Sequence, residues 1–301
     1  MTITLPKITN KQQEILELLY RYRFLNRIQI QQFLGHTDKR RVIAWLKDLR
    51  EKDYLEWIYS TDFSEKTKPA IYYLSLNGIR YLKTLVWDDD SGSVYQPEEL
   101  HKRYRERERA RSFVDRSILV ADCCLALETI DQVISHKAVD TNTAASDTVK
   151  RTNTPKISYS YYTEADYLDP DSEYYFLSEH ETLRSNLCIV KQKGRTTINY
   201  LLEIVDATLP HYRLRSRLKA YVNYLSNSEW EGEEPEPIIL LAFPTLYSLI
   251  YAKRRVKKLL TDEYDDEIPE DIHIRFTTTE QLQEQGITAT IWEEGRKLHG
   301  L

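Results

Sequence analysis

The sequence predicts an α/β protein of two domains, a small helical domain that carries a β-hairpin and a larger mixed α/β domain. The chain has 301 residues, 41% of them apolar, and a domain usually holds about 100–200 residues. The first 86 residues show three segments of helical period followed by two aromatic, strand-like runs. The last third alternates strand-like and helix-like segments, which favours a mixed sheet.

Charge is distributed unevenly along the chain. The net charge is −5, yet residues 1–85 hold 15 Lys and Arg against 9 Asp and Glu, a net charge of +6. A basic N-terminal part favours an anionic partner. No apolar run reaches the ~18 residues of a membrane span, and no signal peptide is evident, so we expect a cytoplasmic protein with no membrane partner. The three cysteines fit neither a disulfide framework nor a zinc site, and we expect them to be reduced and buried.

Three helices are expected in the N-terminal part. Thr9 is a suitable N-cap for a helix over KQQEILELLYRY. A second helix fits NRIQIQQFLG, with Gly35 at its C-terminal end and an inward face of Ile28, Phe33 and Leu34. A third fits TDKRRVIAWLKDLREKDY, where the residues expected to be buried are Val42, Trp45, Leu46 and Leu49.

Two strand-like runs follow, YLEWIYS (54–60) and AIYYLSL (70–76), separated by a polar segment. Three helices and a β-hairpin form the order of a winged helix-turn-helix domain, over residues 1–86, which reads double-stranded DNA with its third helix. The residues expected at DNA are Thr37, Lys39, Arg40, Arg41, Lys47, Lys66 and Lys68. The alternatives are that these cations are merely solvated, or that the domain docks a protein.

Residues 87–112 are expected to form a linker and the start of a long charged helix. WDDDSGSVYQPEE lacks an apolar period and marks a boundary. The following RERERAR block is more typical of a solvated helix with internal ion pairs than of a DNA contact. Residues 140–156 are expected to be a loop.

In the second domain, 113–301, two acidic residues stand where metal-dependent nucleases of the PD-(D/E)XK class place theirs. Asp166 follows the strand-like KISYSYY, and Glu203 comes late in TTINYLLEIVDAT, while YYFLS (174–178) is expected to extend the hairpin. Two or three carboxylate oxygens are needed to hold Mg²⁺ beside a phosphate. Lys219, on the next helix, is the candidate for a catalytic lysine.

The remaining segments indicate fold. PIILLAFP and IHIRFTT are expected to be strands, LYSLIYAKRRVKKLL a helix, and DEYDDEIPED (262–271) a solvated loop. Walker, GxGxxG, HExxH and GxSxG motifs are lacking, so ATPase, dehydrogenase, zinc protease and serine hydrolase functions have no support.

In the order of these segments the sequence resembles the replication-relaxation proteins of bacterial plasmids and other mobile elements. The resemblance is carried by ITNKQQEILELLYRYRFLNRIQIQQFL, YYLSLNG, FVDRSILVADCCLAL, EADYL, LLEIVDAT and RLRSRLKAYVNY, and by the final strands. It implies a winged helix followed by a restriction-endonuclease-like mixed α/β domain. The family's core is similar to LEIDxGT, but here Val205 takes the place of the second acid, which stands one residue later as Asp206.

This one-residue shift turns Asp206 to the opposite face of a regular strand. We therefore favour an inactive nuclease-like domain with no cofactor over an active Mg²⁺- or Mn²⁺-dependent nickase using Asp166 and Glu203. A buried Glu203 needs a partner, for which Arg213 and Lys219 are candidates. Arg213 and Arg217 are also expected to contact phosphate.

The predicted function is DNA binding in the replication or relaxation of a plasmid or mobile element, or in the regulation of either. Partners are expected among replication or conjugation proteins, and a homodimer is expected because operators are often palindromic. An adaptor that docks other proteins is the third alternative.

Overall fold

The computed structural model divides into two compact units, neither of which is a single stretch of chain. Unit 1 holds Met1–Leu125 and Thr163–Tyr175, and unit 2 holds Ala126–Tyr162 and Phe176–Leu301. The bounds of these units differ from those of the predicted ranges 1–86, 87–112 and 113–301. The residues that the structure describes are 5–59, 67–87, 100, 103–140, 157–179, 183, 185–227, 230–232, 235–264, 272–294 and 297–299.

Helix α1 (Asn10–Tyr22) begins at the predicted cap, Thr9. The Thr9 side chain accepts a hydrogen bond from the backbone of Gln12, and the Gln12 side chain accepts one from the Thr9 backbone at 2.9 Å. This reciprocal pair is a capping box, which satisfies two backbone donors at the helix start. Gln12 Nε2 also donates to Asp48 at 2.6 Å and so connects α1 to the third helix.

Helix α2 (Arg27–Phe33) is capped by Asn26 and is followed by Gly35 at a φ of +58°, as a C-terminal glycine should be. The prediction that Ile28 faces inward is wrong, because this side chain is 45% exposed. The Asn26 cap sets the helix so that Gln29 and Ile30 are the buried positions. Gln29 Nε2 donates to the Ile118 carbonyl at 2.9 Å and to Asp122 at 2.7 Å, which accounts for a buried amide.

Helix α3 (Lys39–Glu51) buries Val42, Leu46 and Leu49, as predicted. Trp45 is only partly buried, and its ring meets His36 edge to face at 5.0 Å. Asp38 is the N-cap of the helix, and its carboxylate accepts from the backbone of Arg40 at 2.8 Å.

A three-stranded antiparallel sheet completes the winged helix-turn-helix fold. Its strands are β1 (Leu25–Asn26), β2 (Leu55–Ile58) and β3 (Ile71–Leu74), in the order β1-β3-β2, and helix α4 (Leu76–Trp87) follows. The predicted hairpin is thus confirmed, with the short β1 added at its side. Its predicted tip lies largely in residues 60–66, outside the described part of the chain.

One face of this sheet packs against the long helix α6 (Arg111–Asp140). Phe24, Tyr73 and Val114 form a buried cluster, and the partly buried side chains around it are Ile58, Ile71, Phe113 and Ile118. Because Ile58 pairs with Ile71 across the strands, both point to the same side. The start of α6 therefore belongs to unit 1.

The RERERAR block differs from the solvated helix that the sequence predicts. Residues Arg103–Glu108 form a 3-10 turn, η1, that ends before α6 begins. Glu106 is only 2% exposed and accepts from Arg23 Nε and Nη2 at 2.9 and 2.7 Å. Arg103 is also buried, with Nη1 3.7 Å from the same carboxylate. Arg103 from the same turn and Arg23 from a distant part of the chain thus compensate the charge of one buried carboxylate.

Unit 2 is built on a seven-stranded mixed sheet in the order β10-β9-β8-β7-β6-β5-β4. The strands β6, β7 and β8 run parallel, while β5 pairs antiparallel with β6 and β9 with β8. Their bounds are β4 Ile157–Thr163, β5 Leu187–Lys193, β6 Thr196–Ile204, β7 Ile238–Phe243, β8 Ile274–Thr278, β9 Trp292–Glu294 and β10 Lys297–His299. The β7 strand is buried throughout, as its apolar run predicts.

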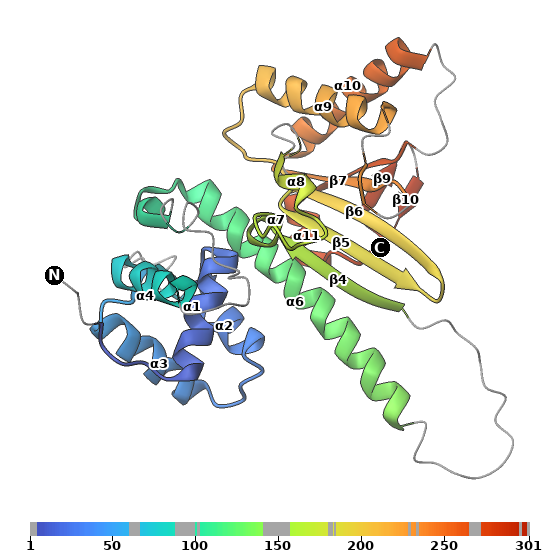
Figure 1. Ribbon diagram of the computed structural model, residues 1–301. Helices are drawn as coiled ribbons and strands as arrows, with labels where there is room; N and C mark the ends of the chain where they lie inside the picture. Colours follow the sequence, from blue (N-terminus) through green and yellow to red (C-terminus); the bar gives the residue numbers. More distant parts are fainter. Residues whose placement is uncertain are drawn as a thin grey trace, which may run out of the picture. The chain divides into compact units, whose positions relative to one another are not determined.

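Helices α9 (His211–Ser226) and α10 (Leu246–Tyr264) lie side by side next to this sheet (Figure 1). The segment 174–178 does not extend a hairpin: Phe176–Glu179 forms the short helix α8, and Phe176 packs its ring against Trp230 at 5.0 Å. Helix α11 (Thr279–Gln285) follows β8 directly. The mixed α/β class is confirmed, and the strand β5 was not anticipated.

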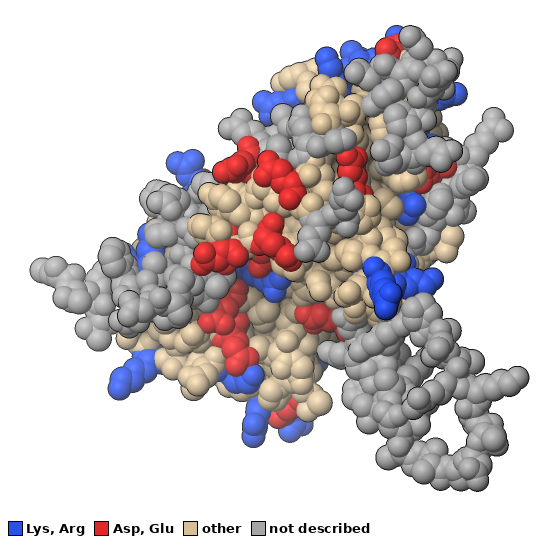
Figure 2. All heavy atoms as spheres, turned by 45° about the vertical axis from the view of Figure 1, so that its right-hand side comes forward, with Lys and Arg blue, Asp and Glu red and all other residues tan. Residues whose placement is uncertain are grey.

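The predicted loops and the predicted lack of a membrane span can be compared only with the described residues. The predicted loops 140–156 and 262–271 and the predicted linker 87–99 lie wholly or largely outside the described residues. None of the described helices is long and apolar enough to cross a membrane. On the face drawn in Figure 2, basic and acidic side chains both reach the surface.

Candidate functional site

The predicted DNA-contacting residues at the start of α3 are brought together on one exposed turn. Thr37, Lys39, Arg40 and Arg41 are all exposed, and so is Lys47 two turns later. Arg41 and Lys47 have 71% exposed side chains and only long contacts to acids, 3.9 Å to Asp38 and 3.7 Å to Glu51. Such exposed, loosely paired cations are free to exchange these weak contacts for phosphate or base edges.

The same helix exposes two residues that the sequence pattern had not singled out. Ile43 is 43% exposed and Ala44 is exposed beside it, between Arg40 and Lys47. A helical wheel drawn from the predicted buried positions would have placed them opposite the core, because Val42, Leu46 and Leu49 occupy the other side.

Near the loop end of strand β2 an arginine and two aromatic rings form a partly exposed stack. The guanidinium carbon of Arg50 lies 3.4 Å from the centroid of the Trp57 ring, and Tyr59 stacks on Trp57 at 5.6 Å. Trp57 is 41% and Tyr59 49% exposed. Burial raises the pKa of neighbouring Tyr72, and Arg50 opposes that shift. Lys68 is exposed just before β3, while Lys66 lies outside the described residues.

Asp166 follows strand β4 as predicted, and it lies in the short helix α7 (Glu164–Tyr167). Its carboxylate accepts from the backbone and hydroxyl of Thr163 at 2.6 and 2.9 Å. It also accepts from Arg21 Nη2 at 2.9 Å and Nε at 3.2 Å. One carboxylate thus caps α7 and ties it to α1.

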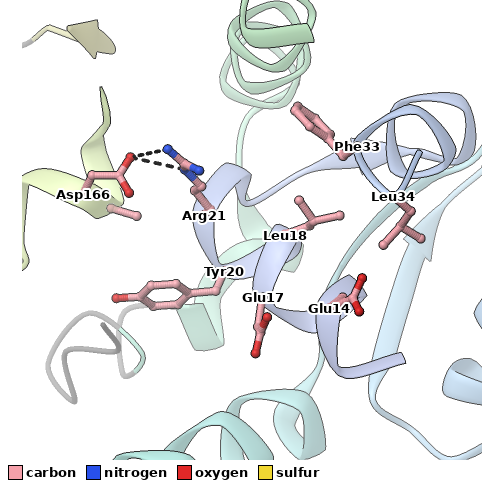
Figure 3. A pocket seen from close by; sticks show the side chains of 9 residues that line it. Glu14, Glu17, Leu18, Tyr20, Arg21, Phe33, Leu34 and Asp166 are labelled. Atoms are coloured by element: carbon pink, nitrogen blue, oxygen red, sulfur yellow. Dashed lines mark hydrogen bonds and ion pairs between the residues drawn. The ribbon is translucent and has the colours of Figure 1, made fainter. Parts of the chain in front are cut away.

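The Arg21–Asp166 pair borders an open pocket of about 400 Å³ in unit 1 (Figure 3). Leu18, Phe33 and Leu34 supply its apolar lining, and Glu14 and Glu17 add carboxylates from α1. In Figure 3 the Asp166 side chain points toward the guanidinium of Arg21.

Glu203 is buried near the end of β6, only 2% exposed. One carboxylate oxygen accepts from Arg217 Nη1 and the other from the Tyr221 hydroxyl at 2.6 Å. Arg217 and Tyr221 stand four residues apart on α9 and therefore face the same side. The partner of Glu203 is Arg217, so the expectation of Arg213 or Lys219 is wrong.

The other residues singled out on this side of the sheet do not join Glu203. Asp206 lies beyond β6 and accepts from the backbone and hydroxyl of Thr208 at 2.8 and 2.7 Å, as in an Asx turn. Lys219 is exposed on α9, out of phase with Arg217 and Tyr221. Arg213 is exposed and donates from Nε to the Tyr212 hydroxyl at 3.2 Å.

The donor set around Glu203 does not fit a divalent cation as it stands. Both carboxylate oxygens already accept hydrogen bonds, and the Arg217 guanidinium brings a positive charge to the place where an ion would sit. Asp166 belongs to unit 1 and Glu203 to unit 2. Among the described residues, no group of three or more His, Cys, Asp or Glu is arranged to hold a metal ion. The shared metal site of Asp166 and Glu203 stays a prediction.

Comparison with known proteins gives a distant structural similarity and a match to a family model. The structure of a mutant of Lactococcus lactis ZitR is similar at 19% sequence identity, covering 36% of this chain and 76% of that one with a TM-score of 0.23. No curated protein sequence matches the chain. The replication-relaxation family matches residues 16–235, which run from α1 through the winged helix and past α9. This match covers well over half of the sequence, and the chain therefore belongs to the replication-relaxation family.

Proposed function

We propose that this protein binds double-stranded DNA through α3 and the β2–β3 hairpin and acts in the replication or relaxation of a plasmid or other mobile element, or in its regulation. The exposed cluster Lys39, Arg40 and Arg41 at the start of α3 carries the proposal, because a winged helix presents this part of its third helix to the major groove. Family membership supports a role connected with replication.

In this proposal the protein is cytoplasmic and binds DNA as a homodimer, with replication or conjugation proteins as further partners. Arg213 and Lys68, both exposed, add phosphate contacts. The mixed α/β unit serves as a scaffold with no bound metal and without nuclease activity. What supports this last part is the engagement of both Glu203 oxygens by Arg217 and Tyr221.

Fluorescence anisotropy with labelled duplex DNA tests the DNA-binding part. Replacing Arg40 and Arg41 with alanine should weaken binding and lower the slope of log K against log salt by about 0.9 for each phosphate that the variant no longer neutralises. The matched control is Lys11→Ala, which removes an exposed cation from α1 of the same unit and should leave the slope unchanged. Equal binding by the double variant and the wild type would remove α3 as the DNA-contacting element.

A nicking assay tests the proposed lack of nuclease activity. The full chain is incubated with supercoiled plasmid and Mg²⁺ or Mn²⁺, beside the Glu203→Gln variant. We expect no nicked product from either protein. Nicking by the wild type that disappears in the variant would replace the scaffold with a metal-dependent nickase.

A further inference from the structure

We propose that Ile43 and Ala44 on α3 read thymine methyl groups in the major groove, so that the DNA target carries thymine beside the base contacted by Arg40. This inference rests on the proposed function, because it requires α3 to enter the groove. It goes further in assigning a base preference to two apolar side chains.

The exposed face of α3 carries cationic side chains at its two ends and apolar side chains between them. Arg40, Ile43, Ala44 and Lys47 are exposed at the i, i+3, i+4 and i+7 spacing of one helix face. Ile43 is 43% exposed. The stripe is therefore cationic at both ends and apolar in the middle.

Thymine supplies the apolar group that such a stripe fits. In the major groove only thymine presents a methyl group, and apolar side chains contact it there, while arginine donates to guanine O6 and N7. The cations Arg40 and Lys47 flank Ile43 and Ala44 and attract a polyanion. They would therefore hold the two apolar side chains against the DNA and out of water. Charge complementarity thus favours DNA over a protein as the occupant of this face.

The acidic groups of α3 do not block this contact. Asp38 accepts from the backbone of Arg40 at 2.8 Å and is held as the N-cap. Asp48 faces away, toward Gln12 and Lys52, at 2.6 Å from each. Glu51 ends the helix, one turn beyond Lys47 and 3.7 Å from its ammonium group.

Helix geometry sets the length of DNA that the stripe can cover. From Arg40 to Lys47 the helix rises about 10 Å at 1.5 Å per residue, or about three base pairs at 3.4 Å each. Ile43 and Ala44 lie in the middle of this span. The thymines should therefore fall within about three base pairs of the base contacted by Arg40.

The experiment begins by selecting bound duplexes from a random library with the full chain. Each thymine of the selected site is then replaced singly by deoxyuridine, which lacks only the methyl group and keeps the same base pairing. At one or two adjacent positions we expect wild-type binding to weaken roughly threefold to fivefold, the effect of leaving one methyl group unburied. The Ile43→Ser variant should bind the thymine site more weakly and lose most of this sensitivity to deoxyuridine.

The control variant is Leu76→Ser, which removes an apolar side chain of similar exposure, 42%, from another helix of unit 1. It should keep the full response to deoxyuridine. Binding that is sequence-selective but unaffected by deoxyuridine at every position overturns the thymine assignment while leaving DNA binding in place. If the Ile43→Ser substitution changes the molar mass of the protein in light scattering but leaves its affinity for DNA unchanged, Ile43 belongs to a protein interface. This outcome also overturns the thymine assignment. Selection of no duplex at all contradicts the proposed function itself.

Discussion

Removal of the Arg217 guanidinium tests whether the pair with Glu203 holds the sheet and α9 together. In the Arg217→Ala variant a carboxylate that is 2% exposed keeps the hydrogen bond from the Tyr221 hydroxyl but loses the cation that balances its charge. Breaking one side of a buried ion pair costs about 3–5 kcal/mol. Because the Arg217 side chain is 29% exposed, water reaches the vacated space, and we expect a loss of about 3 kcal/mol.

The free energy of unfolding is measured by urea denaturation of the full chain, followed by circular dichroism. Hydrogen exchange of peptides from β6 and α9 locates the loss in unit 2. Arg213→Ala is the matched control, since this arginine stands one helical turn earlier and is exposed. An exposed substitution of this kind should change stability by less than about 0.5 kcal/mol.

A double variant separates the burial of charge from the loss of packing. In Glu203→Gln with Arg217→Met both charges are gone, and the glutamine oxygen still accepts from Tyr221. The double variant no longer buries an unpaired charge, although the glutamine amide gains no acceptor from methionine, so part of the lost stability should return. The reasoning is refuted if Arg217→Ala costs less than about 1 kcal/mol, or if the double variant is less stable than the single one.

Other predictions concern pH, packing and thiol chemistry. Hydrogen bonds from Lys52 and Gln12 lower the pKa of Asp48 from its ordinary 3.8. Ionised Asp48 therefore contributes its full stabilisation above a pH of about 3.8, and this stabilisation is lost as the pH falls through the lower pKa of the folded state. The Asp48→Asn variant should be less stable than the wild type at neutral pH, and thermal melts at acid pH should give the two proteins the same stability. Gly78→Ala should lower the melting temperature, because an added Cβ would collide with the Tyr54 carbonyl; an unchanged melt would contradict this contact. Ellman's reagent should react only after denaturation, since burial raises the pKa of Cys123 and all three thiols are buried: Cys123, Cys124 and Cys188.

Local signals in the sequence were enough for most of the elements. The Thr9 cap, the glycine after α2, the apolar face of α3 and the apolar run of β7 each depend on neighbours within a few residues. The segment 174–178 looked like a strand because it is aromatic, but its ring contact with Trp230 comes from far along the chain. Aromatic content alone does not distinguish a strand from a short packed helix.

The partners of the acidic residues were harder to predict. The sequence pattern predicts that Glu203 lies in a strand and that it needs a cationic partner. The partner predicted from the sequence, Arg213 or Lys219, differs from Arg217 in the structure. Which arginine reaches Glu203 depends on how α9 is rotated about its axis against the sheet, and the spacing of residues within the helix does not determine this rotation. Asp166 binds Arg21, 145 residues away. Such pairing follows from tertiary packing, which single-sequence patterns do not contain.

Because the chain passes from unit 1 to unit 2, back to unit 1 and again to unit 2, its folding during synthesis and its response to truncation are both affected. Because unit 1 takes back Thr163–Tyr175 after the chain has already entered unit 2, a fragment ending at Leu125 lacks the segment that supplies a partner for Arg21. On the ribosome this part is complete only once the first strand of the large sheet has emerged. Expression of either half alone would therefore yield an unfinished fold, and deletion studies on this chain need internal linkers in place of simple truncation.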